Sequence, residues 1–183
     1  MEHTYFFAVD LGATSGRTIL GCLGEGKMEL KELTRFPNHI IETGGHCYWD
    51  IYALYNEIIK GLGLKLSLKE QFETIKKNFE ALAGKDYAAS RGEYLNGIIM
   101  ANYLGYEFID AATVICFDKD GEFDSEKTNA VREAKFANIE RAVVPGFYGA
   151  MPNGKVKTFS RGGSDVTGSI VARALKADMY AVS

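Results

Sequence analysis

The chain has 183 residues, of which 46% are hydrophobic, enough to bury the core of one ordinary domain and too few for two large ones. Its formal net charge is -3, whereas a protein that binds nucleic acid usually has an excess of basic residues, so we expect no nucleic-acid partner. No apolar run is long enough to span a membrane, and three scattered cysteines without a C-x-x-C pair are typical of reduced thiols, so we expect a cytoplasmic protein without a membrane partner.

The N-terminal part of the chain predicts three strands joined by polar turns, over residues 5–9, 18–23 and 28–36. The first turn contains an acid, a glycine, two hydroxyl side chains and a base, namely Asp10, Gly12, Thr14, Ser15 and Arg17. Amides and hydroxyls in such a turn can hold a phosphate, and the acid can hold Mg²⁺ through water. A plain hairpin with a polar turn is the alternative interpretation.

This stretch carries a family resemblance. The sequence A-V-D-L-G-A-T-S-G-R from Ala8 resembles the first phosphate loop of the FGGY carbohydrate kinases, although Ala13 stands where many members have threonine. The runs R-F-P-N from Arg35 and G-G-H-C-Y-W-D-I-Y-A-L from Gly44 are most similar to rhamnulokinases. The resemblance covers roughly residues 1–62. It implies a ribonuclease-H-like β-hairpin segment, a sugar substrate, and ATP with Mg²⁺ at the five residues of the first turn.

The middle of the chain predicts helices and short strands. Helical spacing favours a helix over 68–82 and another after Glu93 that stops at Gly105, with these apolar stripes: Phe72, Ile75, Phe79 and Leu82; Leu95, Ile98, Ile99 and Tyr103. Strands are expected over 108–110, 113–117 and 141–147, and a helix over 125–140. Residues 118–121 predict a solvated acidic turn, since Gly121 does not suit a calcium-binding EF-hand loop.

Residues 158–178 predict a short polar strand, a tight turn at Gly162 and Gly163, and an amphipathic helix. Ser164 or Asp165 is expected to cap that helix, and its apolar face is expected to contain Val166, Ile170, Val171, Ala174 and Leu175. Glycines before a helix N-terminus let an anion approach free N–H groups, and Arg161 adds a planar positive charge. An ordinary strand-to-helix connection is the alternative.

The run S-R-G-G-S-D-V-T-G from Ser160 resembles the substrate-loop signature of the aspartokinases, in the amino-acid-kinase superfamily. Matching pieces precede it in family order: KDYAASRGEYLNG from Lys85, NYLGYEFIDAA from Asn102 and VVPGFYGAMPNGKV from Val143. The resemblance implies an α/β fold, a parallel-sheet, three-layer amino-acid-kinase-like segment. It also implies phosphoryl transfer from ATP to the side-chain carboxylate of aspartate.

The same resemblance assigns substrate-binding roles, while no catalytic residue is identified. Arg161 would clamp an aspartate carboxylate, Glu93 would receive the ammonium group or hold the loop, and Ser164 and Asp165 would line the same pocket. Each has a plainer interpretation: Glu93 favours the first turn of its helix, Asp165 is only a cap, and Arg161 is a surface residue.

The two resemblances overlap over residues 53–62, so we interpret the chain as a hybrid with segments 1–53 and 54–183. The leading hypothesis is an aspartokinase-like kinase fragment; the others are a rhamnulokinase-like fragment and a non-catalytic hybrid. We expect the segments not to share one sheet, and therefore no useful turnover of aspartate by the chain alone. The spacing of His39, His46 and Cys47 matches no common zinc pattern, so we predict no metal there and packing roles for Tyr48 and Trp49.

Overall fold

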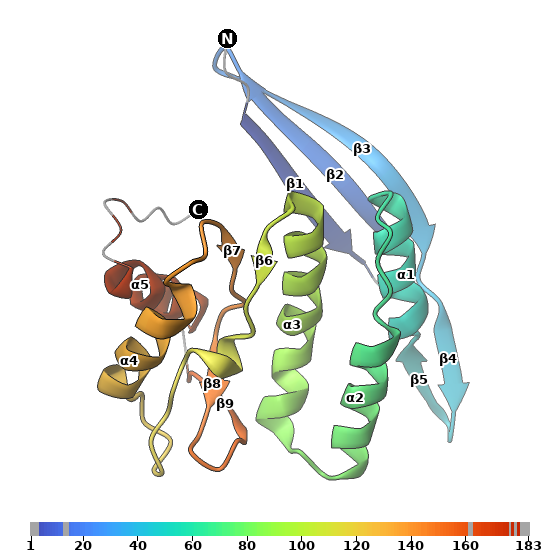
Figure 1. Cartoon of the computed structure of the whole chain (residues 1–183). Helices are drawn as coiled ribbons and strands as arrows, with labels where there is room; N and C mark the ends of the chain where they lie inside the picture. The colour runs from blue at the N-terminus through green and yellow to red at the C-terminus, as the bar shows by residue number, and fades with distance from the viewer. Residues whose placement is uncertain (1–3, 13–14, 161–162, 176, 178, 180–183) are drawn as a thin grey trace. The chain divides into compact units, whose positions relative to one another are not determined.

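The computed structural model describes residues 4–12, 15–160, 163–175, 177 and 179. It contains two compact units, Met1–Leu66 and Ser67–Ser183. Strands open the chain and helices dominate the rest of it (Figure 1). The predicted division into segments 1–53 and 54–183 rests on sequence similarity and not on compactness, so it stays a prediction.

The first unit contains the three predicted strands as an antiparallel sheet in the order β1-β2-β3, with bounds Thr4–Leu11, Ser15–Gly24 and Lys27–Pro37. Gly24 pairs with Lys27, so only Glu25 and Gly26 form the second turn, both with positive φ. Two such residues match the right-handed twist of a hairpin, and glycine adopts this conformation without strain. The prediction of three consecutive strands is therefore confirmed.

A hairpin and a helix complete this unit. Strands β4 (Ile40–Thr43) and β5 (His46–Trp49) were not expected from the sequence. Helix α1 (Ile51–Gly61) begins where the Asp50 carboxylate accepts a hydrogen bond from the Ala53 amide at 3.0 Å. The predicted packing roles of Tyr48 and Trp49 are wrong, because their side chains are 52% and 42% exposed on β5. Trp49 is the one tryptophan of the sequence.

The second unit contains helices α2 (Lys69–Glu80), α3 (Lys85–Leu104), α4 (Ser125–Phe136) and α5 (Gly163–Ala174). Helix α3 starts earlier than expected, so the predicted start after Glu93 is wrong. Its stop is confirmed by Gly105, which has a φ of 68°. The α2 stripe is only half right, since Phe72 and Ile75 are buried while Phe79 and Leu82 are 48% and 88% exposed.

Short strands link these helices. Strand β6 (Glu107–Phe108) pairs in parallel with β7 (Ala142–Val143), and β8 (Tyr148–Ala150) pairs antiparallel with β9 (Val156–Thr158). Cys116 adds a parallel bridge to Ala150. The predicted strands 113–117 and 141–147 were therefore too long. A 3₁₀ turn, η1 (Ala111–Thr113), begins instead at Asp110, whose carboxylate accepts from the Ala112 amide.

The core of the second unit surrounds these strands. Its buried residues are Ile109, Ala111, Val114, Ile115, Phe117, Phe136 and Tyr148. Helix α3 packs beside β6, β7 and β9. Helices thus cover short parallel and antiparallel strand pairs, and the expected α/β class is confirmed.

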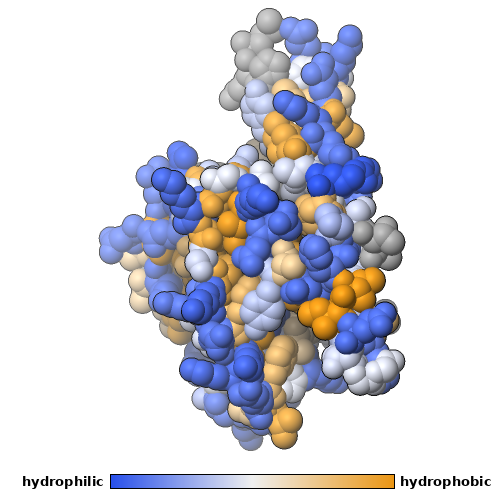
Figure 2. Space-filling view, turned by 90° about the vertical axis from the view of Figure 1, so that its right-hand side faces the viewer, coloured by the Kyte–Doolittle hydropathy of each residue, from blue (hydrophilic) through white to orange (hydrophobic). Residues whose placement is uncertain are grey.

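Apolar side chains also reach the surface, as orange patches between blue polar ones (Figure 2). In the first sheet, Phe6, Met28 and Leu30 are 48%, 52% and 73% exposed, and they gather above Gly21, whose added Cβ would contact all three. Among the described residues, no helix is both long and apolar enough to cross a membrane.

We expect the β1-β2-β3 sheet to open at a lower free energy than the core around Val143. Most of its side chains are exposed or half-buried, whereas Val114, Ile115 and Tyr148 are fully buried. Native-state hydrogen exchange should therefore show weaker protection of the β2 amides than of the amides near Tyr148. Equal protection of both sets in one cooperative transition would contradict this prediction.

Candidate functional site

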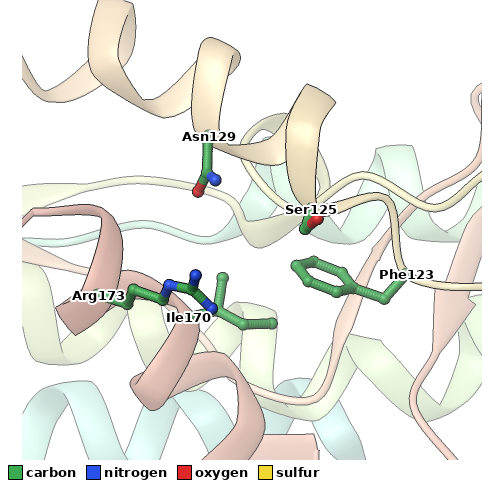
Figure 3. A pocket seen from close by; sticks show the side chains of 5 residues that line it. All are labelled: Phe123, Ser125, Asn129, Ile170 and Arg173. Carbon is green, nitrogen blue, oxygen red and sulfur yellow. The ribbon is translucent and has the colours of Figure 1, made fainter.

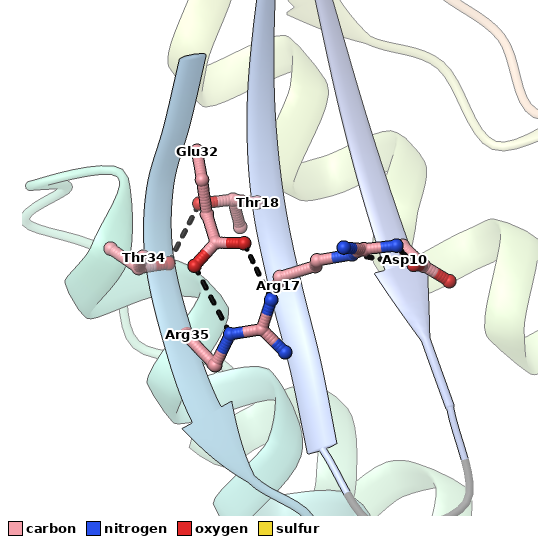
Figure 4. Close-up of polar contacts among 6 residues, drawn as sticks. All are labelled: Asp10, Arg17, Thr18, Glu32, Thr34 and Arg35. Atoms are coloured by element: carbon pink, nitrogen blue, oxygen red, sulfur yellow. Dashed lines mark hydrogen bonds and ion pairs between the residues drawn. The ribbon is translucent and has the colours of Figure 1, made fainter. Parts of the chain in front are cut away.

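The predicted phosphate turn lies at one end of the β1–β2 hairpin. Asp10 pairs with Arg17 in the register, so the hairpin places these two residues side by side. The Arg17 guanidinium donates to Asp10 Oδ2 at 2.7 Å (Figure 4). Gly12 donates its amide to the Ser15 carbonyl at 3.0 Å and accepts at its own carbonyl from the Asn38 amide. Thr14, the remaining predicted residue, lies outside the described residues.

Polar contacts extend from this turn along the sheet. The Arg35 guanidinium donates to both Glu32 carboxylate oxygens, at 2.7 and 3.1 Å, and this lowers the pKa of Glu32. Thr18 and Thr34 share a hydrogen bond of 2.7 Å (Figure 4). In this arrangement Asp10 and Arg17 are already paired, so a metal ion at the turn has to compete with Arg17 for Asp10, and a phosphate has to compete with Asp10 for Arg17.

The predicted substrate loop lies where α5 begins. Arg161 and Gly162 are outside the described residues, but Gly163, Ser164 and Asp165 form the first turn of α5. The predicted cap is therefore wrong: Ser164 and Asp165 lie inside the helix and not ahead of it. The apolar stripe is also partly wrong, since Ile170 packs on the core while Val166 and Leu175 are 38% and 47% exposed.

Close packing fixes the start of α5 against residues 145–147. A Cβ at Gly163 would lie 2.6 Å from Phe147 Cβ, closer than such atoms approach, so only glycine fits there. The Thr167 hydroxyl donates to the Gly163 carbonyl at 2.7 Å and accepts from the Phe147 amide at 3.0 Å. Thr167 thus joins the first turn of the helix to the loop on which it rests.

Glu93 lies in the middle of α3. The helical repeat places it on one face with Asp86 and Gly97. Asp86 pairs with Lys157 of β9 at 3.7 Å, and a Cβ at Gly97 would lie 3.4 Å from the Pro145 ring. Glu93 and Ser164 therefore lie on two helices that both contact residues 145–147, since Ser164 packs against Gly146.

The sequence interpretation missed a buried arginine next to Glu93. Arg91 is only 8% exposed, and its guanidinium carbon lies 4.4, 4.5 and 5.4 Å from the ring centres of Tyr87, Tyr94 and Tyr148. Its Nε and Nη2 both donate to Ser90 Oγ, at 3.1 and 2.8 Å. The signal was available, because tyrosines four residues before and three after an arginine share its helix face.

This arginine cluster connects α3 to the core. Tyr148, on β8, is fully buried and donates its hydroxyl to Asp110 Oδ1 at 2.8 Å. Burial raises the pKa of Tyr148, and the Asp110 charge raises it further, so the phenol stays protonated. Burial and Asp110 also raise the pKa of Tyr94. Because Tyr148 directly follows Phe147, the cluster supports the loop under α5.

A small cavity of about 90 Å³ lies between α4 and α5 (Figure 3). Arg173 and Ile170 line it from α5, and Ser125 and Asn129 from α4. Beside it, the guanidinium of buried Arg132 donates to the Ile170 carbonyl and to Asn129 Oδ1, which joins the two helices. Over the described part of the chain, no cluster of three or more His, Cys, Asp or Glu is arranged to hold a metal ion.

Two aspartokinases are among the known proteins to which this chain is similar. The chain is similar to the crystal structure of aspartate kinase from Clostridium acetobutylicum, with a TM-score of 0.67 and 54% identity over 71% of this chain and 30% of that one. It is also 34% identical to aspartokinase 3 of Bacillus subtilis, over 70% of this chain and 31% of the relative.

A different relative matches another part. Rhamnulokinase of Bacteroides thetaiotaomicron is 64% identical over 70 residues, which cover 38% of this chain and 14% of the relative. The shares of this chain covered by rhamnulokinase and aspartokinase together exceed its length, so the two matches overlap. This supports a hybrid sequence. The chain spans less than a third of the length of each of these relatives.

The family model of the amino acid kinase family, finally, matches residues 30–182, which is most of the chain. The match takes in nearly all of the second unit and also residues 30–66 of the first. The chain belongs to the amino acid kinase family.

Proposed function

We propose that residues 54–183 are part of an aspartokinase-like kinase that binds aspartate through the loop before α5 and uses ATP with Mg²⁺. Arg161 holds a carboxylate of the substrate, and Ser164 and Asp165 line the pocket from the first turn of the helix. Glu93, on α3, receives the ammonium group. The names of the similar proteins, aspartate kinase and aspartokinase 3, support this substrate.

The observation that carries the proposal is the seating of Gly163 on Phe147. The contact fixes where α5 begins, and Thr167 holds it from both sides. A fixed helix start presents free N–H groups and the positive end of the dipole to an anion. Arg161 stands two residues before Gly163 in the sequence, and its positive charge would favour the same anion.

A second candidate function has its own observation. The first 62 residues resemble a sugar kinase, and a rhamnulokinase is 64% identical over 70 residues. Asp10, Gly12, Ser15 and Arg17 lie together at the end of the β1–β2 hairpin, and Thr14 belongs to the same turn in the sequence. A phosphate or Mg²⁺ of ATP would bind at this turn. A chain that binds neither substrate is the third possibility.

We expect aspartate to raise the melting temperature of the chain and the Arg161→Ala variant to lose most of this effect. A charge-assisted hydrogen bond to a carboxylate contributes about 1.5–3 kcal/mol, so the dissociation constant should rise roughly 10- to 100-fold. Thermal unfolding with aspartate, rhamnulose and MgATP measures the response. Arg173→Ala, at the other end of α5, is the matched control and should respond like the unchanged chain.

Each result decides between the functions. An aspartate shift that depends on Arg161 supports the aspartokinase-like site. A rhamnulose shift without an aspartate shift supports the sugar-kinase alternative. Equal aspartate shifts in the unchanged chain and in Arg161→Ala remove Arg161 from the site, and no shift with any ligand supports the non-catalytic hybrid.

A further inference from the structure

A second, larger cavity opens beside the first turn of α3. Its volume is about 420 Å³, within the range of pockets that hold small molecules. Three separated segments line it: Lys85 and Asp86 of α3; Phe117 and residues 121–123; and residues 157–160 at the end of β9. Helix α3 and β9 lie next to each other there (Figure 1).

One wall of the cavity is aromatic. The ring of Phe159 lies 4.9 Å from that of Phe117 and 6.0 Å from that of Phe123, measured between centres. Phe117 is almost completely buried, while Phe123 and Phe159 are only half-buried. An apolar group of a ligand can therefore pack against Phe123 and Phe159 and shield the exposed parts of these two rings from water.

The polar lining carries charges of both signs in equal number. Lys85 and Lys157 are cationic, and Asp86 and Glu122 are anionic. Lys157 and Asp86 face each other across 3.7 Å, a loose ion pair. Within the described residues, neither Lys85 nor Glu122 forms an ion pair. The cavity thus offers one cation and one anion that lack an opposite charge.

We propose that this cavity binds a small zwitterion with an apolar body, an α-amino acid with an apolar side chain. Lys85 receives the carboxylate, Glu122 receives the ammonium group, and the side chain packs on Phe123 and Phe159. A ligand of one sign leaves one of the two charges unmatched, and an uncharged ligand leaves both. The cavity adjoins the proposed aspartate loop at Ser160, but the contacts proposed here need neither Glu93 nor Arg161.

The test is titration calorimetry of the full chain with L-phenylalanine as the probe. We expect a dissociation constant of about 1–10 mM, because the cavity is open and partly solvated. 3-Phenylpropanoate lacks only the ammonium group and phenethylamine lacks only the carboxylate, so each should bind roughly tenfold more weakly. Lys85→Met and Glu122→Gln should weaken L-phenylalanine by a similar factor.

Matched controls separate this site from others. Lys119→Met and Glu126→Gln remove the same charges from exposed positions nearby that do not line the cavity, and they should bind like the unchanged chain. Arg161→Ala should also keep the affinity, which distinguishes this cavity from the aspartate loop. No binding of L-phenylalanine, equal binding of the three probes, or unchanged binding by both cavity variants would overturn the proposal.

Discussion

Replacing Gly149 with alanine is expected to lower the free energy of unfolding of the second unit by about 3 kcal/mol. Gly149 is buried on β8, and an added Cβ would overlap the carbonyl oxygen of Ile115 and lie 2.7 Å from its Cγ2. The backbone cannot shift easily to make room, because the same carbonyl oxygen accepts a hydrogen bond from the Ala150 amide at 2.9 Å. Urea unfolding followed by far-ultraviolet circular dichroism measures the change.

Gly92 provides the matched control for this substitution. It lies inside α3, and apart from its chain neighbours and the nearby backbone of its own helix, no described atom lies within 4 Å of where its Cβ would be. Gly92→Ala should therefore stabilise the helix by about 0.5–1 kcal/mol, the usual difference between the two residues in a helix interior. If both alanine variants unfold at the same urea concentration, the contact at Ile115 does not restrict residue 149.

The second large effect is expected for Arg91→Ala, at about 3 kcal/mol of destabilisation. The substitution removes the guanidinium from between Tyr87, Tyr94 and Tyr148 and leaves a cavity between α3 and β8. Arg91→Lys should recover only part of the loss, because an ammonium group lacks the plane that stacks on the rings. The same urea titration applies.

Arg141 serves as the control for Arg91. It also lies over a tyrosine, with its guanidinium carbon 5.7 Å from the ring centre of Tyr106, but its side chain is 63% exposed. An exposed pair of this kind contributes about 0.5–1 kcal/mol, so Arg141→Ala should change stability little. Equal losses in the two alanine variants would show that burial adds nothing to the Arg91 contacts.

Periodicity predicted strands β1 to β3 of the first unit and the helices of the second, but it missed β4 and β5 and did not predict where the elements end. The sequence predicted that this helix begins after Glu93, yet α3 begins at Lys85 and continues through that position. The stacking of Arg91 on tyrosines from two elements favours the longer helix, and β8 lies more than fifty residues away in the sequence. Such a tertiary contact cannot be read from a local window.

The candidate site was predicted as a motif and not as a packing arrangement. The pattern from Ser160 to Asp165 pointed to the start of α5, and the structure places Gly163 there. The support of that start by Phe147 and Thr167 was not foreseen, since neither residue type signals such a contact. The open cavity at Lys85 was also missed, because its three lining segments are far apart in the sequence.

The exposed indole of Trp49 gives the chain a built-in optical reporter. It is the one tryptophan of the sequence, it lies on β5, and it is 42% exposed, so its emission responds to events in the first unit. The proposed aspartate loop and the zwitterion cavity both belong to the second unit. A change in tryptophan fluorescence on adding aspartate or L-phenylalanine would therefore reveal coupling between the sugar-kinase-like and aspartokinase-like parts. Unchanged fluorescence would indicate that the two parts act independently.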